Sequence, residues 1–397
     1  MTQKTTTSFE GIAAREEAFQ LATYKKFPFA PVRGEGCWVW TSEGERFLDL
    51  YGGHAVCATG HCHPRVVEAL REQAGRLLFY SNVVYSDVRA EAAERLVGCA
   101  PEGMTKAFFC NSGTEANENA MRMARMKTGR PNVITFTGGF HGRTADSISA
   151  TFLGKYRDIG RPNVPGHLCA EFGSLESVEA LADETVAAVM LEPVQSMAGV
   201  RVAPPEFFEG LRRLCDERGM LLIFDEVQTG VGRTGSWFFA GSEAAGRVVP
   251  DVITLAKALG SGAPVGACLT TEAVASAIRE NDLGTTFGGG MLAMAAVVAT
   301  LKAIEEDGML ENARAVESFL RDSLAGVAGV AGVRGVGLLL GVEFDEPVGA
   351  RVNKALLERR IITGTSSDPN VLRLLPPLCL TVDEAALFVG ALKEVLS

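Results

Sequence analysis

Two charged side chains follow short apolar runs, where burial would make them chemically reactive. LLIF (221–224) ends in Asp225, and VITL (252–255) is followed one residue later by Lys257. A carboxylate at the end of a buried run needs a cation or hydrogen-bond donors as partners. An isolated lysine there can act as a nucleophile or a base, because desolvation lowers its pKa. A solvated turn and a helix-surface lysine are the alternative interpretations.

A third apolar run leads into residues that suit an anion. AFFC (107–110) is followed by Asn-Ser-Gly-Thr (111–114), small and hydroxylated residues at the start of a helical pattern. The first backbone N–H groups of a helix have no partner within it, and the helix dipole favours a negative charge there. The turn could therefore bind an anion. A simple helix cap at Ser112 or Asn111 is the alternative.

Two more runs are followed by an aromatic ring, a guanidinium and a carboxylate. VITF (133–136) precedes a glycine-rich turn with Phe140 and Arg143, and VAAVML (186–191) precedes Glu192. The glycines let the chain turn sharply beside the sheet. The arginine could bind a carboxylate through two parallel hydrogen bonds, although a single arginine is more often a surface residue.

The apolar runs predict buried strands, because they are rich in β-branched or aromatic residues and lack polar alternation. Helical patterns lie between several of them, at 115–125 and 205–218. This alternation predicts an α/β fold with a large, mainly parallel sheet covered on both faces. Ligands of such sheets bind beyond the carboxyl ends of the strands, so the residues named above are expected to meet at one edge.

The two ends of the chain predict a second, smaller α+β domain. Residues 1–55 contain a helical arm and a hairpin, and they are assigned as the arm and part of the small domain. Residues 56–295 are assigned as the large, ligand-binding domain. Residues 296–397 alternate helices with a Gly/Val-rich segment and are assigned as the C-terminal small domain.

Composition and charge exclude several classes of protein. The chain of 397 residues is 47% hydrophobic with a net charge of −10, which argues against nucleic acid or an acidic membrane as a partner. No apolar run suits a membrane helix, and the first eight residues lack the apolar part of an export signal. We therefore expect a cytoplasmic protein whose nine cysteines are reduced. His61-Cys62-His63 resembles a metal cluster only faintly, and no metal site is predicted.

One cofactor uses an anion-binding turn, an aromatic ring, an arginine, a buried carboxylate and an isolated lysine together. Pyridoxal phosphate places its phosphate at a helix start, bonds its aldehyde to a lysine, and needs a carboxylate that keeps its ring nitrogen protonated. The cation missing beside Asp225 is then a pyridinium, and in a low-dielectric site the two charges hold each other ionised. The chain is therefore predicted to bind pyridoxal 5′-phosphate.

Longer motifs give the chain a specific resemblance to a known family. In order they are GHCHP (60–64), FFCNSGTEANE (108–118), FHGRT (140–144), EPVQ (192–195), LLIFDEVQTGVGRTG (221–235), TLAKALG (254–260), GTTFGG (284–289) and RLLPPL (373–378). From about residue 20 onward, the chain resembles the class III (subgroup II) pyridoxal-phosphate-dependent aminotransferases, most closely the acetylornithine and ornithine aminotransferases. The resemblance implies fold type I, the aspartate aminotransferase-like fold, and a homodimer with shared active sites.

The resemblance also implies roles for individual residues. Lys257 would carry the covalent bond and move protons, Asp225 would pair with the ring nitrogen, and Glu192 would help to position the site. The other cofactor-binding residues would be Ser112, Gly113 and Thr114 at the phosphate, Phe140 and Val227 on the two ring faces, Gln228 at the ring hydroxyl, and Thr286 at the phosphate of the neighbouring subunit's cofactor.

Two arginines are expected to bind substrate. Arg143 would bind one carboxylate, and Arg373 the other carboxylate of a dicarboxylic partner. In ornithine-type enzymes a glutamate soon after the EPVQ motif covers the second arginine while an amine without a second carboxylate is bound. Met197 stands at that position here, so Arg373 is expected to stay uncovered unless another group masks it. GGGML (288–292) also departs from the common GGNP pattern, at a helix entry.

The leading hypothesis is transfer of the terminal amino group of N2-acetylornithine, or a similar acylated diamino acid, to 2-oxoglutarate, as in arginine biosynthesis. Another class III ω-amino acid or diamine transaminase, with pyruvate as acceptor, is the alternative, followed by an aminomutase or racemase of the same fold. The side-chain pocket stays open: His54, Tyr80, Tyr85 and the 365–370 loop are candidates, and ordinary packing explains each equally well.

Overall fold

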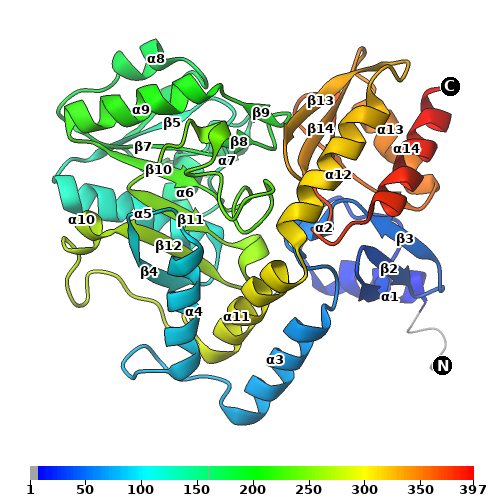
Figure 1. Ribbon diagram of the computed structural model, residues 1–397, viewed down its shortest axis with the longest axis horizontal. Coiled ribbons are helices and arrows are strands. Elements are labelled where there is room, and N and C mark those ends of the chain that lie inside the picture. The colour runs from blue at the N-terminus through cyan, green and yellow to red at the C-terminus, as the bar shows by residue number, and fades with distance from the viewer. Residues whose placement is uncertain (1–7, 160) are drawn as a thin grey trace.

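The computed structural model describes residues 8–159 and 161–397. A seven-stranded sheet forms the centre of its larger part (Figure 1). In spatial order the strands are β4 (Met104–Cys110), β12 (Gly266–Thr271), β11 (Val252–Leu255), β10 (Leu221–Asp225), β7 (Val186–Leu191), β5 (Asn132–Phe136) and β6 (His167–Ala170). Among these described strands β12 alone runs antiparallel to its neighbours. The predicted α/β fold with a mainly parallel sheet is therefore confirmed.

Helices cover both faces of this sheet, as Figure 1 shows. α5 (Gly113–Thr128) and α9 (Pro205–Arg218) correspond to the two predicted helical patterns. α5 begins after Ser112 and ends at Gly129, whose φ of 73° is the left-handed conformation in which glycine closes a helix. Because helices enclose the sheet, β7 is buried along its whole length.

The carboxyl ends of five parallel strands meet at one edge of the sheet. β4 leads into residues 111–114, β5 into residues 137–144, and β7 into Glu192. β10 ends at Asp225, and β11 ends two residues before Lys257. This edge therefore collects the chemical groups that the sequence places after each apolar run.

The two ends of the chain meet in the smaller part of the molecule (Figure 1). One sheet consists of β1 (Pro31–Glu35), β2 (Trp38–Thr41), β3 (Arg46–Asp49) and β15 (Ile361–Ile362). Another consists of β13 (Val330–Val336), β14 (Leu339–Phe344), β17 (Val371–Leu374) and β16 (Gly364–Thr365). The helices of this part are α12 (Met309–Leu324), α13 (Gly349–Glu358) and α14 (Val382–Leu396). β15 pairs with β3, which ties the N-terminal hairpin to the C-terminal segment.

Three helices, α3 (Pro64–Arg76), α4 (Asp87–Cys99) and α11 (Met291–Glu306), pack together below the two parts in Figure 1. The remaining elements are α1 (Phe9–Phe19), α2 (Gly52–Ala55), α6 (Ala145–Ser149), α7 (Tyr156–Ile159), α8 (Leu175–Glu179), α10 (Glu272–Ala275), β8 (Val194–Gln195), β9 (Arg201–Val202), and the 3₁₀ helices η2 (Glu243–Ala245) and η3 (Lys257–Gly260). None of the helices described is long and apolar enough to span a bilayer. Residues 1–7, on which the expectation about an export signal rests, lie outside the described residues.

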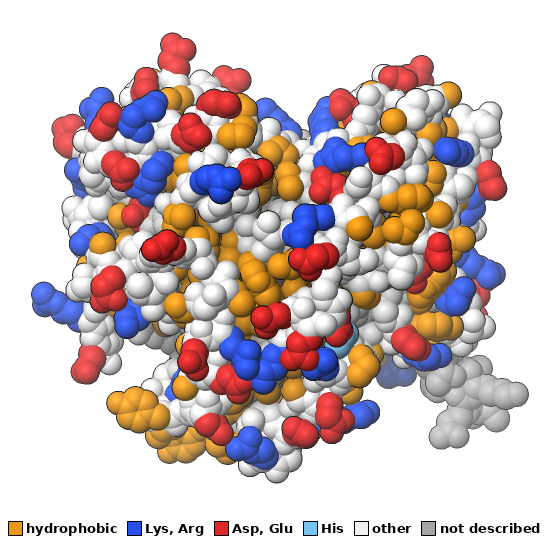
Figure 2. Space-filling model, in the orientation of Figure 1, with side chains coloured by type: hydrophobic (Ala, Val, Ile, Leu, Met, Phe, Trp, Pro, Cys, Tyr) orange, Lys and Arg blue, Asp and Glu red, His pale blue; other side chains and the backbone are white. Residues whose placement is uncertain are grey.

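The segment between α3 and α4 exposes a group of large apolar side chains, which we call the apolar segment. Its exposed members are Leu77, Leu78, Phe79, Tyr80, Val83, Val84 and Tyr85. The exposed ring of Phe287 packs on Phe79, with 5.3 Å between centroids. Figure 2 shows hydrophobic side chains gathered at the lower edge, where Figure 1 places this segment, and charges of both signs over the rest of the face. Such a patch marks a contact surface.

Candidate active site

A cavity of about 720 Å³ opens at the carboxyl edge of the seven-stranded sheet. It brings together most of the residues that the sequence predicted: Ser112, Gly113, Thr114, Phe140, Arg143, Glu192, Asp225, Val227, Gln228, Lys257 and Arg373. Arg373 comes from β17 in the smaller part of the molecule, and the others follow strands of the large sheet. The cavity therefore lies where the two parts meet.

Asp225, at the end of β10, is 3% exposed and firmly held. Its Oδ2 atom accepts a hydrogen bond from Asn117 Nδ2 (2.7 Å) and lies 2.8 Å from His141 Nδ1. Thr254 fixes Asn117 in turn, since its hydroxyl donates to Asn117 Oδ1 (2.6 Å). The backbone N–H of Val227 donates to Asp225 Oδ1 (3.1 Å). The carboxylate therefore presents one fixed direction to the cavity.

Sequence reasoning missed Asn117 and His141 as parts of the site. Both are buried, and both lie inside motifs that carry the family resemblance. A polar residue on the buried face of a predicted helix was the available signal for Asn117, because buried amides need partners. No comparable signal marked His141, which follows a glycine-rich turn.

Glu226, the carboxylate that follows Asp225 in the sequence, does not line the cavity. It is buried and accepts hydrogen bonds from the backbone N–H groups of Phe239 (2.7 Å) and Ala240 (2.8 Å) and from the Thr229 hydroxyl (3.1 Å). Burial raises the pKa of Glu226 to about 7. The adjacent acids thus do different things: Asp225 faces the ligand cavity, and Glu226 supports the loop behind it.

Lys257 begins η3 with a φ of 42° and lines the cavity, so its side chain does not lie on an outer helix surface. A residue other than glycine in this left-handed region costs roughly 1–3 kcal/mol, and such strain gathers at functional sites. Burial lowers the pKa of Lys257 below its ordinary value, while the charges of Asp225 and Glu192 oppose this effect. The neutral amine, the form that attacks a carbonyl, is therefore more abundant at neutral pH.

The turn at Ser112, Gly113 and Thr114 has the features of an anion site. The Ser112 hydroxyl caps α5 by accepting a hydrogen bond from the Glu115 N–H (3.3 Å). A Cβ atom at Gly113 would lie 2.8 Å from Val227 Cγ1, so only glycine fits there. The N–H groups of Gly113 and Thr114 lie in the first helical turn, where a helix offers them no carbonyl partner.

Gln228 and two apolar residues make the cavity suitable for a planar polar ligand. Among the described residues, buried Gln228 Oε1 has no hydrogen-bond partner. Such an orphaned atom costs about 1–3 kcal/mol, which a ligand hydroxyl would relieve. Phe140 and Val227 line the same cavity, and the Phe140 ring is held edge-on by Tyr156 at 5.5 Å between centroids. Pyridoxal phosphate fits these residues, because Gln228 could bind its ring hydroxyl, Asp225 could pair with its ring nitrogen, and the turn at 112–114 could bind its phosphate.

Glu192 supports the turn that carries Phe140. Its Oε1 atom accepts a hydrogen bond from the Phe140 N–H (2.8 Å). Burial and the neighbouring charge of Asp225 raise the pKa of Glu192 to about 7. The structure therefore places Glu192 as a support for the ring-covering turn as well as on the wall of the cavity.

Arg373 is 6% exposed and is held by neutral groups. It donates to the Thr365 carbonyl (2.7 Å), the Ser196 hydroxyl (3.1 Å) and the Tyr51 hydroxyl (2.9 Å). Within the described part of the chain no carboxylate pairs with it, and Met197 lines the same cavity. A desolvated guanidinium with neutral partners favours an anionic ligand.

Arg143 is an exposed cation on the cavity wall. Its guanidinium lies 5.3 Å from the ring centre of Tyr24 and 5.4 Å from that of Tyr156. His54 lines the cavity too, and its Nδ1 lies 2.9 Å from the Tyr51 hydroxyl. Burial and the charge of Arg373 lower the pKa of His54, which keeps its imidazole neutral at neutral pH.

Several candidate residues lie elsewhere. Thr286 is exposed and does not line the cavity of its own chain. Tyr80 and Tyr85 belong to the apolar segment and are 51% and 105% exposed. The 365–370 loop reaches Arg373 through a backbone carbonyl, so it supports the site from behind.

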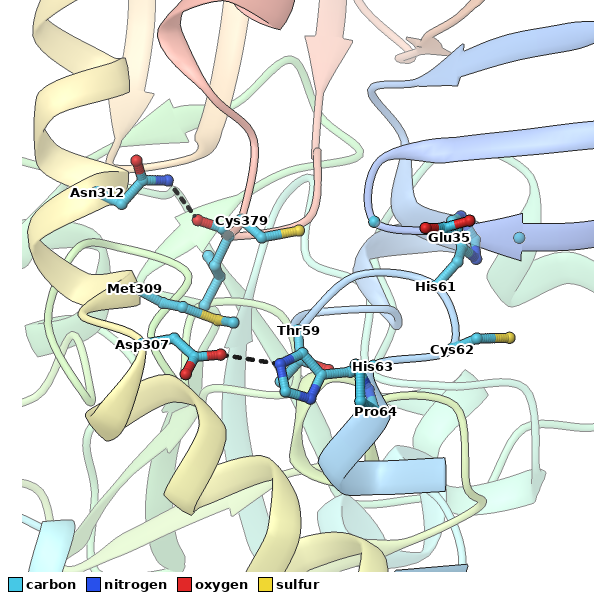
Figure 3. Close-up of a pocket in the computed structure, with 13 residues that line it drawn as sticks. Glu35, Thr59, His61, Cys62, His63, Pro64, Asp307, Met309, Asn312 and Cys379 are labelled. Carbon is cyan, nitrogen blue, oxygen red and sulfur yellow. Dashed lines mark hydrogen bonds and ion pairs between the residues drawn. The ribbon is translucent and has the colours of Figure 1, made fainter. Parts of the chain in front are cut away.

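A second cavity of about 640 Å³ contains the His61-Cys62-His63 run. Figure 3 shows His63 turned towards Asp307, with 2.9 Å between Nε2 and Oδ2. The Nε2 atom of His61 lies 2.8 Å from Asp49 Oδ2, so the imidazoles of His61 and His63 pair with different acids. Across residues 8–159 and 161–397, no three histidine, cysteine, aspartate or glutamate side chains gather in a way that could hold a metal ion.

The chain is similar to aminotransferases over almost its whole length. The family model described as aminotransferase class-III matches residues 19–396. The acetylornithine aminotransferase of Methanopyrus kandleri is 44% identical over 386 residues, which are 96% of this chain and 98% of that protein. A [LysW]-aminoadipate semialdehyde transaminase of Deinococcus radiodurans is 38% identical over 388 residues, which are 97% of this chain and 90% of that protein.

Solved structures agree with this match. The crystal structure of the ornithine aminotransferase of Toxoplasma gondii has a TM-score of 0.91 and 29% sequence identity, and covers 98% of this chain and 95% of its own. The predicted fold type I architecture and pyridoxal phosphate cofactor are thus confirmed. The chain belongs to the class III aminotransferases and is a pyridoxal-phosphate-dependent aminotransferase.

Proposed function

We propose that the enzyme transfers the terminal amino group of N2-acetylornithine, or of a similar acylated diamino acid, to 2-oxoglutarate. The observation that carries this proposal is the pair of arginines, Arg143 and Arg373, on the wall of the cavity that contains Lys257. Two cations suit the two carboxylates of 2-oxoglutarate. The names of the Methanopyrus and Deinococcus relatives favour an acylated diamino acid as donor.

Each predicted cofactor residue has a proposed task when pyridoxal phosphate is bound. The N–H groups of the Ser112–Thr114 turn hold the phosphate, Asp225 pairs with the ring nitrogen, and Gln228 binds the ring hydroxyl. Phe140 and Val227 pack on the ring faces. The bound cofactor supplies an electron sink that acidifies the proton on the amino-bearing carbon of the substrate.

Lys257 moves the proton that this electron sink releases. As a neutral amine, its Nζ atom takes the proton from the amino-bearing carbon of the substrate. As the ammonium that results, it then gives this proton up on the cofactor side of the substrate nitrogen. Burial lowers the pKa of Lys257, which raises the share of the neutral amine that can act as a base. Asp225 and Glu192 remain close enough to stabilise the ammonium that forms.

Met197 supports a second candidate for the donor. Met197 lines the cavity with Arg373 but has no carboxylate that could cover it, so the switch by which ornithine-type enzymes alternate between an amine donor and glutamate is not supplied at this position. A different ω-amino acid or diamine donor with pyruvate as acceptor, a pair that does not need this switch, is therefore the alternative, and an aminomutase or racemase comes after it.

Single half-reactions decide between these donors. We expect N2-acetylornithine and glutamate to convert the cofactor spectrum to that of the amine form, with release of one oxo product per site, while simple diamines and alanine react at least about tenfold more slowly. Conversion by diamines and alanine only would favour the alternative. Spectral change without release of an oxo product would favour an aminomutase or racemase.

Two substitutions of Met197 test whether Arg373 is open to a substrate carboxylate. We expect Met197→Glu to weaken glutamate binding about tenfold, because the new carboxylate would compete for Arg373. Met197→Leu keeps size and polarity and should bind glutamate as the wild type does. Equal glutamate affinity in both variants would contradict an open Arg373.

We also propose that two copies of the chain assemble with the apolar segment in their interface. This segment and the exposed Phe287 lie next to Thr286, the residue predicted to reach the partner's phosphate. Thr286→Val is expected to leave a dimer in sedimentation experiments but to weaken cofactor retention about tenfold, through loss of one charge-assisted hydrogen bond. Wild-type cofactor affinity in this variant would contradict a shared site.

A further inference from the structure

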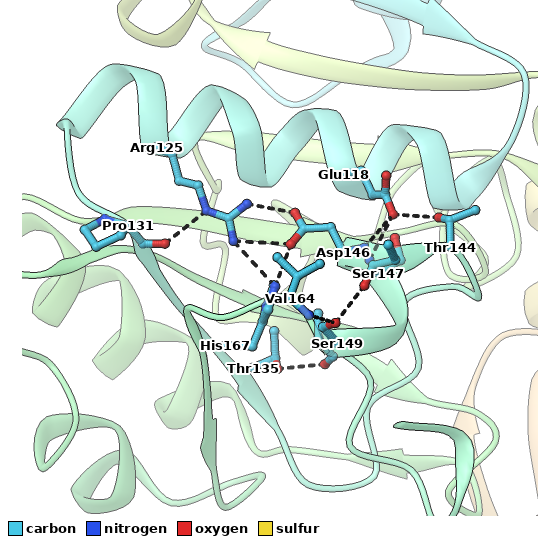
Figure 4. A network of polar contacts seen from close by, with 12 residues as sticks. Glu118, Arg125, Pro131, Thr135, Thr144, Asp146, Ser147, Ser149, Val164 and His167 are labelled. Atoms are coloured by element: carbon cyan, nitrogen blue, oxygen red, sulfur yellow. Dashed lines mark hydrogen bonds and ion pairs between the residues drawn. The ribbon is translucent and has the colours of Figure 1, made fainter. Parts of the chain in front are cut away.

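A continuous chain of hydrogen bonds links the phosphate turn to the loop that carries Arg143. The hydroxyls of Thr114 and Thr144 lie 2.6 Å apart, and the Thr144 hydroxyl donates to Glu118 Oε1 (2.6 Å). Glu118 and Thr114 both belong to α5, and Thr144 directly follows Arg143. Figure 4 shows Glu118 directed from α5 at Thr144 and the start of α6.

The chemistry of these groups sets the direction of the chain. A carboxylate only accepts hydrogen bonds, so the single Thr144 proton goes to Glu118. The Thr114 hydroxyl must then donate to Thr144 and has no proton left for an anion. Thr114 can therefore hold a phosphate through its N–H group, while its side chain anchors the neighbouring loop.

Glu118 also fixes the backbone just beyond Arg143. Its Oε1 atom accepts hydrogen bonds from the N–H groups of Asp146 (3.0 Å) and Ser147 (3.0 Å), which open α6. α6 has no cap from its own Thr144 side chain, so Glu118 supplies this cap from α5. Charge-assisted bonds of this kind are the stronger ones in proteins.

A second contact attaches α6 to α5, nearer to the C-terminal end of α5 than Glu118. Arg125 Nη1 donates to Asp146 Oδ2 (2.7 Å), and His167 Nε2 lies 2.6 Å from Asp146 Oδ1 (Figure 4). α6 is thus attached to α5 at two points, and one of them, Glu118, is next to the loop of the active site.

Arg143 depends on this support because its own side chain has weak partners. Among the residues described, its guanidinium forms no ion pair and lies over the rings of two tyrosines. The loop before it is tight, since a Cβ atom at Gly142 would overlap the Thr114 hydroxyl. We propose that Glu118 is a positioning residue: through Thr144 it sets the Arg143 guanidinium for a substrate carboxylate and joins that site to the phosphate turn.

This proposal rests on the role of Arg143 in the proposed function, so its test measures binding apart from turnover. The probe is succinate, a dicarboxylate that cannot be transaminated, titrated calorimetrically into holoenzyme. Glu118→Ala and Thr144→Val are expected to raise the Kd of succinate and the KM of glutamate about tenfold, with kcat within about threefold. Thr144→Ser keeps the hydroxyl and should restore wild-type values.

Two controls separate positioning from a general structural effect. Arg122→Ala, an exposed residue of the same helix, should change neither constant. Combining Glu118→Ala with Arg143→Ala should cost little more than Arg143→Ala alone, because one residue acts through the other. Additive losses, an unchanged succinate Kd in Glu118→Ala, or no succinate binding by the wild type would overturn the proposal. Succinate binding without transfer from N2-acetylornithine would instead remove the proposed donor and leave the positioning role standing.

Discussion

Replacement of Lys257 by alanine is expected to reduce amino-group transfer by at least about 10³-fold, because both the attacking amine and the proton carrier are lost. Lys257 lines the cavity with Asp225 and Glu192, and burial lowers its pKa. The measurement is single-turnover conversion of reconstituted holoenzyme by saturating glutamate. Lys354→Ala, which removes a lysine whose side chain is 81% exposed, should react as the wild type does.

An added amine makes this prediction more specific. If the loss reflects the missing proton carrier, a small primary amine such as methylamine should restore part of the rate in Lys257→Ala, since the emptied space can admit it. A bulkier amine should restore less. A variant that keeps its rate within tenfold of the wild type without any added amine would contradict the assigned role.

Asp225→Asn is expected to retain the cofactor and lose about 10²-fold or more of kcat, because a neutral amide no longer stabilises a protonated ring nitrogen. The asparagine Oδ1 can take the place of Asp225 Oδ2 and accept the hydrogen bond from Asn117, while the bond from the Val227 N–H is lost. Cofactor content is measured by absorbance and turnover by release of the oxo acid.

The adjacent carboxylate provides the matched control for this variant. Glu226→Gln removes one charge next in the sequence, but Glu226 faces the backbone of Phe239 and Ala240 and does not line the cavity. It should lower stability and leave kcat per folded molecule near that of the wild type. Comparable losses of kcat in both variants would show that the effect is not specific to position 225, and a fully active Asp225→Asn would show that charge at position 225 is not required.

Much of the site could be predicted because parallel strands end at a common edge. The five apolar runs mark β4, β5, β7, β10 and β11, and the residues after each run meet in one cavity. Two strands of the large sheet, β6 and β12, were missed for physical reasons. β6 has only four residues, starts with a histidine and is half-buried at two of them, and β12 reads GACLTT, in which small and hydroxylated residues hide the strand pattern.

Other features depend on contacts between segments far apart in the sequence. The apolar run before Asp225 and Glu226 does not decide which acid faces the ligand: the family resemblance assigned Asp225, and the partners of each carboxylate supply the physical reason. The left-handed backbone of Lys257 also has no signal in the sequence, because residues other than glycine seldom adopt it. The link from Glu118 to Thr144 joins α5 to a loop that follows a different strand.

Borohydride reduction of the holoenzyme tests most directly whether Lys257 holds pyridoxal phosphate. The reagent fixes a cofactor that is bonded to an amine, and peptide mass mapping then identifies the modified lysine. We expect a single modified peptide that contains Lys257, in an amount equal to the bound cofactor. A cofactor fixed on a different lysine, or a holoenzyme in which Lys257 stays unmodified after reduction, would contradict this expectation.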